Sequence, residues 1–250
     1  MNDPHVSALV YRVKHDETVN YDKANPLEYE TAIFKVSVKS CEAHFEMKEF
    51  TTAERAREVV ESFIRQWKFA TALDYGPGEF ELVFFDAVVE DRKPMPGVVA
   101  VKGVFTVGVA GSVSMVVGRA TYPEPPINVA INADVEAMAL RYSRYREGKD
   151  TLVGMAYFCL TVLEQAAGGR PAIPGKFGIS STVLKMLGGL TGGKGGSQAR
   201  KSVGRSHELI ADERNWIEQA TKRLIRRVAE VAHDPVASTP LVTMGDLPKL

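Results

Sequence analysis

Hydrophobic and polar residues alternate with a period of two along much of the first half of the chain. Alternating runs occur at 5–13, 28–39, 42–48 and 80–89. Because successive side chains of a strand point to opposite faces, this alternation is typical of strands with one buried face. The pair Ser40 and Cys41 separates the second run from the third, which predicts a β-hairpin.

The period changes to three and four after Thr51 and Thr52. Apolar residues then recur as they do on one face of a helix, and either threonine is a suitable N-cap. The helix is expected to end before the Gly76–Pro77–Gly78 stop. The apolar positions of this helix are Ala56, Val59, Val60, Phe63, Ile64 and Trp67.

The Val-rich stretch 98–118 is the part of the chain that most resembles a membrane segment. It carries Lys102 and is interrupted by Gly108 and Gly111, so two strands joined by a turn are expected there instead of a span. The order of elements is then roughly βββ-α-βββ. Since strands and helix do not alternate as βαβ units, residues 1–126 are expected to form an antiparallel, β-rich α+β domain with one long helix.

The Pro-rich segment 122–126 is the best candidate for a domain boundary. Behind it, the apolar spacing predicts helices at about 132–147, 150–167, 180–187 and 211–232, with glycines at several of their ends. Residues 127–234 are therefore expected to form an all-helical bundle. Residues 235–250 are expected to be a loose C-terminal tail. The whole chain is thus assigned to the α+β class.

Composition is that of an ordinary globular protein of 250 residues, with 45% hydrophobic and 25% charged side chains and zero net charge. Zero net charge argues against a dominant whole-protein field for nucleic acid or membranes. The charge is unevenly divided, however. Residues 1–150 carry 18 Lys and Arg against 23 Asp and Glu, and residues 151–234 carry 12 against 7. One interpretation is that the basic region 151–234 binds an anionic partner. The other is that its cations are solvated or are attracted to the acidic region 1–150.

The two cysteines, Cys41 and Cys159, lie far apart in apolar segments, which favours buried thiols in a reducing compartment over a disulfide framework. The N-terminus shows no secretory signal pattern, so a cytoplasmic location without membrane insertion is expected. The five histidines are scattered without metal-ligand spacing, so no metal site is expected. Nothing in the sequence calls for a cofactor.

Residues 188–194 satisfy the G-x-x-x-x-G-K spacing of a phosphate-binding loop. Gly195 occupies the position of the Ser or Thr that would bind magnesium, and the segment follows a helix instead of a strand. A flexible loop between helices therefore explains the glycines better. Lys194 could still contact a phosphate backbone.

Basic residues cluster on the last expected helix. With Lys194, the residues Arg223, Arg226 and Arg227 are candidates for nucleic-acid contact through charge and counterion release. The alternative is a solvated face, in which Glu218 pairs with neighbouring Lys222 and Glu230 with the arginines.

Arg200 and His207 precede that helix, with six residues between them. An arginine can hold a scissile phosphate while a histidine moves the proton of a ribose hydroxyl, which suffices for metal-independent RNA cleavage. A helical half with this Arg-x(4–6)-His spacing resembles the HEPN domains, many of which are ribonucleases of defence and toxin systems. The resemblance covers residues 133–233 and implies a catalytic site at a homodimer interface. Arg226 and Arg227 fit the same spacing to His233.

Two functions follow from these patterns. The first is a non-catalytic interaction protein, in which the N-terminal sheet recognises a protein partner and the HEPN-like helical half dimerises. The alternative is a HEPN-like, metal-independent ribonuclease, with His207 as acid and base, Arg200 as phosphate anchor and RNA guided by the basic helix.

Overall fold

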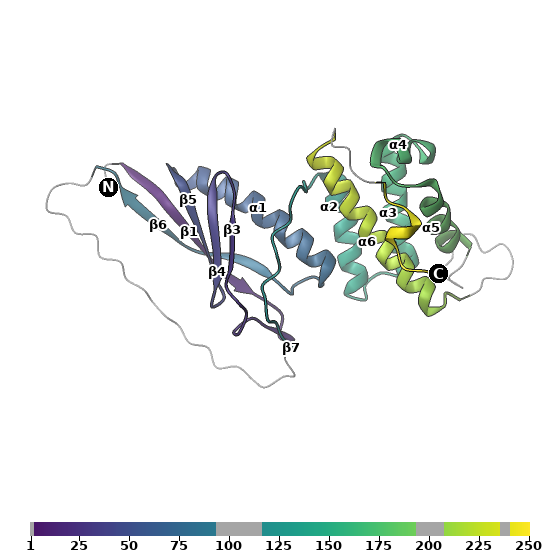
Figure 1. The fold of residues 1–250 in the computed structure, drawn as a ribbon, viewed down its shortest axis with the longest axis horizontal. Helices are drawn as coiled ribbons and strands as arrows, with labels where there is room; N and C mark the ends of the chain where they lie inside the picture. The colour runs from purple at the N-terminus through teal and green to yellow at the C-terminus, as the bar shows by residue number, and fades with distance from the viewer. Residues whose placement is uncertain (1–2, 94–116, 194–207, 236–240) are drawn as a thin grey trace. The chain divides into compact units, whose positions relative to one another are not determined.

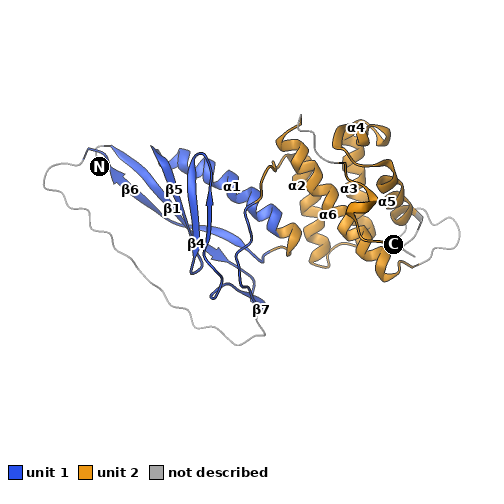
Figure 2. Cartoon of the chain, viewed as in Figure 1, with its two compact units in different colours: residues 1–71, 78–125 blue, residues 72–77, 126–250 orange. Residues whose placement is uncertain are grey.

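The computed structural model describes residues 3–93, 117–193, 208–235 and 241–250, which form two compact units. Unit 1 comprises residues 1–71 and 78–125, and unit 2 comprises residues 72–77 and 126–250 (Figure 2). Strands belong to the first half of the chain and helices dominate the second (Figure 1). The α+β class predicted from the sequence is confirmed.

Within the described residues, the main sheet of unit 1 has five strands in the order β3-β4-β5-β1-β6, and every neighbouring pair is antiparallel. Two further short strands, β2 and β7, pair in parallel. Of the predicted strands over 98–118, residues 98–116 lie outside the described residues and residues 117–118 form β7. The strands are β1 (Pro4–Lys14), β2 (Val19–Asn20), β3 (Leu27–Glu30), β4 (Phe34–Lys39), β5 (Glu42–Thr51), β6 (Glu81–Asp91) and β7 (Val117–Gly118).

The predicted hairpin is confirmed as β4 and β5. Its two turn residues, Ser40 and Cys41, both have positive φ, 52° and 59°, which matches the twist of the flanking strands. The run 28–39 was predicted as one strand, and this is wrong. The hydroxyl of Thr31 accepts hydrogen bonds from the backbone N–H groups of Ile33 and Phe34, at 3.1 and 3.0 Å, and so turns the chain between β3 and β4.

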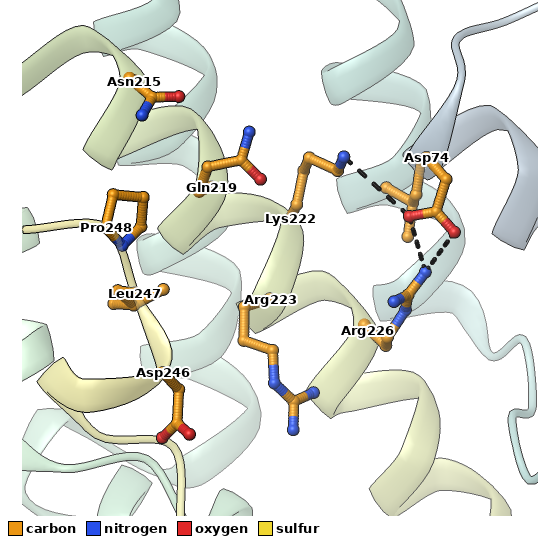
Figure 3. Close-up of a pocket in the computed structure, with 10 residues that line it drawn as sticks. Asp74, Asn215, Gln219, Lys222, Arg223, Arg226, Asp246, Leu247 and Pro248 are labelled. Carbon is orange, nitrogen blue, oxygen red and sulfur yellow. Dashed lines mark hydrogen bonds and ion pairs between the residues drawn. The ribbon is translucent and has the colours of Figure 1, made fainter. Parts of the chain in front are cut away.

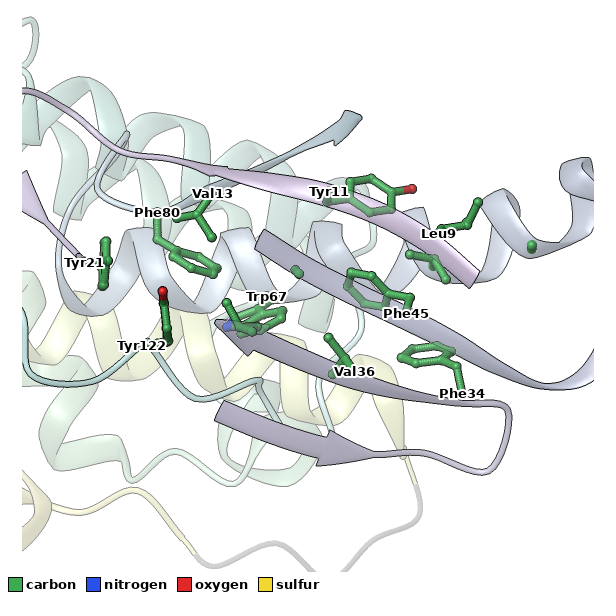
Figure 4. Packing of buried hydrophobic residues seen from close by; sticks show 14 of the residues in the cluster. Leu9, Tyr11, Val13, Tyr21, Phe34, Val36, Phe45, Trp67, Phe80 and Tyr122 are labelled. Atoms are coloured by element: carbon green, nitrogen blue, oxygen red, sulfur yellow. The ribbon is translucent and has the colours of Figure 1, made fainter. Parts of the chain in front are cut away.

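The long helix α1 (Ala53–Asp74) carries the apolar stripe predicted from the sequence. The first part of α1 contributes Ala56, Val60 and Trp67 to the core that the sheet builds (Figure 4). The indole Nε1 of Trp67 donates a hydrogen bond of 3.1 Å to the carbonyl oxygen of Pro123, so the Pro-rich segment closes this core. Many aromatic rings of the core meet edge to face, as Phe63 and Trp67 do with 5.7 Å between ring centroids.

In unit 2, α2 (Ala133–Arg146) begins at the predicted cap, where the Asn132 side chain accepts from the N–H of Val135. The next helix, α3 (Leu152–Ala167), was predicted to be capped by Asp150. Thr151 caps it instead, with its hydroxyl 3.0 Å from the N–H of Gly154. Gly168, with φ of 79°, ends α3 in the left-handed conformation that glycine adopts without strain.

Three further α-helices follow in the described part of the unit, besides the 3-10 turn Arg170–Ala172. They are α4 (Ile173–Phe177), α5 (Ser181–Gly193) and α6 (Ala211–His233). The glycine-rich stretch was predicted to be a loop from Gly188 onward, but α5 continues to Gly193. The prediction gave too much weight to glycine propensity. Leu187 and Leu190 on either side of Gly188 and Gly189 are buried, and this packing holds the helix.

The end of the chain was expected to be loose, and its described residues are not. The backbone N–H of Val242 donates to the carbonyl of Gly178 at 2.7 Å, and Ser180 donates back to Val242 at 2.9 Å. The Val242 side chain is buried. A short 3-10 helix, Met244–Asp246, follows and is capped by Thr243. Burial of one valine, with paired backbone groups around it, anchors the segment.

Among the described helices, no single one is long and apolar enough to cross a membrane. Among these helices, α3 and the segment 170–177 are together long and apolar enough for a span, but they are bent by 78° at the break between them. Several apolar side chains of α3 are buried in the core of unit 2.

Candidate functional site

A polar pocket on α6 is the candidate site (Figure 3). Its floor is one stripe of the helix, because residues spaced by three, four and seven positions share a helical face. The last turn of α1 and the C-terminal segment form its walls, and all of it belongs to unit 2. Its volume is about 450 Å³, and its lining residues are Leu73, Asp74, Asn215, Gln219, Lys222, Arg223, Arg226, Asp246, Leu247 and Pro248.

Asp74 organises one end of the pocket. Its two carboxylate oxygens accept hydrogen bonds from Nη2 of Arg226 at 2.8 and 2.7 Å. The ammonium of Lys222 lies 4.0 Å from the same carboxylate (Figure 3). Burial lowers the pKa of Lys222, while the charge of Asp74 opposes that shift. This end therefore holds a half-buried ammonium beside a carboxylate that Arg226 already engages.

Arg223 and Asp246 line the pocket as well. Nη1 of Arg223 donates to Oε1 of Glu230 at 2.8 Å, which fixes the guanidinium against the helix. Asp246 is held by Thr243, whose backbone N–H donates to Oδ2 at 2.8 Å and whose hydroxyl donates at 2.9 Å. These hydrogen bonds lower the pKa of Asp246. Both acidic side chains of the pocket are thus oriented by neighbours before any ligand arrives.

Arg227 does not belong to this surface. Its side chain is only 2% exposed. Nε donates to the carbonyl oxygen of Phe177 at 2.6 Å, and Nη1 reaches Oε2 of Glu230 at 3.2 Å. A nucleic acid outside the protein cannot reach this guanidinium, so of the three arginines considered for that role only Arg223 and Arg226 are placed to meet a ligand.

Three further site residues were predicted from the sequence. Lys194, Arg200 and His207 lie outside the described residues, so the pairing of Arg200 with His207 stays a prediction from spacing. Within the described ranges, no group of three or more His, Cys, Asp or Glu side chains is arranged to hold a metal ion.

Of the ten lining residues, the sequence analysis named only Lys222, Arg223 and Arg226. Asn215 and Gln219 could have been found, since they share the helical stripe of Lys222, Arg223 and Arg226. Asp74 and the residues 246–248 carry no such signal, because they come from segments far away in the chain.

Comparison with protein-family models, with curated proteins and with solved structures gives no match to this chain.

Proposed function

We propose that this chain is a non-catalytic interaction protein whose N-terminal sheet binds a partner polypeptide along strand β6. One observation carries the proposal. Three consecutive apolar side chains of this edge strand, Val83, Phe84 and Phe85, are exposed by 41%, 36% and 42%. Among the described strands, β6 pairs only with β1.

The two edges of the sheet differ in a way that supports this function. The opposite edge, β3, has four residues, two of them glutamates, and the neighbouring Lys35 bridges to Glu28 at 2.8 Å. A short, charged edge is the usual protection against strand addition. The β6 edge is longer, with eleven residues, and carries the exposed apolar cluster beside its acidic side chains, so it offers a partner strand more contact surface than β3 does and suits β-augmentation better.

An irregular register accounts for the exposure of adjacent aromatic residues. Val10 lies opposite Asp86 and Tyr11 opposite Phe84, which leaves Phe85 as an extra residue in β6. Such a bulge redirects side chains. Arg57 lies 3.9 Å from the ring centroid of Phe84, and Arg12 lies 3.5 Å from that of Phe85.

Charge specifies the partner. Strand β6 contains Glu81, Asp86, Glu90 and Asp91 and no lysine or arginine. A second copy of β6 would bring these like charges together, which is unfavourable across a strand pair. An extended segment with alternating basic and apolar side chains is the better occupant. Self-association of the helical unit is a separate part of the proposal, and the Arg200–His207 ribonuclease stays the alternative.

Two synthetic nonapeptides test the binding, one alternating Lys with Val and one alternating Glu with Val. Fluorescence anisotropy should show at least tenfold tighter binding of the basic peptide. Val83→Lys should weaken that binding about tenfold, because it places a charge of the same sign on the edge. The matched control is Ile33→Lys, which changes an exposed apolar residue in the turn between β3 and β4 and should leave affinity unchanged.

Amide hydrogen exchange of β6 can refute the proposal. If the outward-facing amides of β6 are already protected in the isolated protein, the edge is occupied and the proposal fails. Equal affinities of the two lysine variants would also refute it.

A further inference from the structure

Several polar side chains of the α6 pocket have hydrogen-bond donors that no acceptor among the described residues uses. Within the described part of the chain, the side-chain amides of Asn215 and Gln219 and the ammonium of Lys222 make no hydrogen bond, since Lys222 approaches Asp74 only to 4.0 Å. Arg223 uses Nη1 for Glu230 and leaves Nε and Nη2 without a partner there. Figure 3 shows these side chains along one stripe of the helix.

The acceptors of the pocket do not match these donors. Asp74 directs both oxygens to Arg226, and Asp246 directs Oδ2 to Thr243, which among the described residues leaves one carboxylate oxygen, Oδ1 of Asp246, for these donors. The lining residues carry three cations and two carboxylates. A pocket with a surplus of donors and of positive charge is complementary to a ligand that is anionic and rich in acceptors.

We propose that this pocket binds a small organic phosphate, with the phosphate group between Lys222 and Arg223 and the rest of the ligand along Gln219 and Asn215. Lysine and arginine are the usual partners of phosphate oxygens. The side chains of Leu73, Leu247 and Pro248 supply apolar walls for the organic part. A volume of about 450 Å³ is in the range of small-molecule sites.

A nucleic-acid backbone fits this surface less well. Backbone binding needs many cations spread over an extended surface. Here Arg227 is buried, Arg226 is paired with Asp74, and two carboxylates line the same pocket. This proposal concerns unit 2 and does not depend on partner binding at β6.

Isothermal titration calorimetry with adenosine monophosphate and with inorganic phosphate tests the site. The mononucleotide should bind, phosphate should bind more weakly, and adenosine without phosphate should not bind. Lys222→Met and Arg223→Gln should each weaken mononucleotide binding at least tenfold. The matched control is Arg144→Gln, an exposed arginine of α2 in the same unit, which should stay within twofold of the parent protein.

One variant should act in the opposite direction. Asp74→Asn removes a carboxylate that repels phosphate, so it should tighten binding several-fold, and a fold defect would not produce that gain. Urea unfolding of every variant monitors folding. The proposal is overturned if neither phosphate compound binds at 10 mM (roughly the weakest measurable range for such sites), or if Lys222→Met and Arg144→Gln bind alike. It is also overturned if a single-stranded RNA oligonucleotide binds far more tightly and loses its affinity in the same variants.

Discussion

Arg227 and Phe177 are joined by a hydrogen bond of 2.6 Å from the guanidinium Nε to the backbone carbonyl, inside unit 2. The contact fixes the end of α4 against α6. The next residue, Gly178, has φ of 59° and accepts the hydrogen bond that anchors Val242. One buried arginine thus helps to position the C-terminal segment that walls the α6 pocket.

Replacing Arg227 by leucine should destabilise the protein by about 2 kcal/mol, because the Phe177 carbonyl loses its charged donor in a buried place. Glu230 keeps Arg223 as a partner, so no carboxylate is stranded. Urea denaturation measures the loss. The matched control is Arg226→Leu, which breaks an exposed pair with Asp74 and should cost less than about 1 kcal/mol. Similar losses in the two variants would contradict the assignment of Arg227 to the interior.

Gly178→Ala should also destabilise unit 2. The Cβ of the new alanine would lie 2.6 Å from Nη2 of Arg227. The backbone φ at this position is also one that residues other than glycine rarely adopt. Removing the guanidinium relieves the clash and leaves only the strain. The double variant Gly178→Ala with Arg227→Leu should therefore cost less than the sum of the two single losses, and a double-mutant cycle measures this coupling. Simple additivity would refute the contact.

Glu218 adds to the effect of burial on the pKa of two tyrosines. The hydroxyls of Tyr142 and Tyr145 donate to its two oxygens at 3.1 and 3.0 Å. Burial, with the charge of Glu218 added, raises the pKa of both tyrosines to about 12. Ultraviolet absorbance of the phenolate should therefore show late ionisation of both groups. Glu218→Gln should lower both pKa values, but keep them above 10 because burial remains. An unchanged titration curve would refute the role of Glu218.

The same two tyrosines make stability depend on alkaline pH. The unfolded chain releases these protons near pH 10, whereas the folded protein keeps them to about 12. Between these values the unfolded state binds fewer protons, so the free energy of unfolding falls as pH rises. Urea denaturation should give a lower free energy of unfolding at pH 11 than at pH 9. Glu218→Gln should reduce this difference, because it brings the folded-state pKa values of the two tyrosines closer to the unfolded value.

Ser40→Asn should stabilise unit 1 by roughly 0.5 kcal/mol. Ser40 is exposed with φ of 52°, and asparagine tolerates this left-handed conformation better than serine does. The contrasting variant Ser40→Val places a β-branched residue there and should cost about 1 kcal/mol. Urea midpoints compare the two. Equal midpoints would show that the turn does not limit stability.

The sequence by itself determined the class of the fold and most of its elements, because periodicity and capping act over a few residues. The alternation around Val36 and Phe45, the stripe of α1 and the cap Asn132 are local signals of this kind. The continuation of α5 through Gly188 was not predictable in this way. Burial of its neighbouring leucines outweighs the poor helix propensity of glycine.

Only the tertiary structure decided which charged residues can meet a ligand. Arg226 and Arg227 are adjacent in the sequence and identical in type, yet one lies beside Asp74 in an open pocket and the other is enclosed beneath Phe177. Adjacent residues on a helix point about 100° apart. The two side chains therefore differ in exposure because different segments pack against the two sides of α6. Asp74, Phe177 and Asp246 come from three segments far apart in the chain, and local sequence patterns do not show that these segments meet.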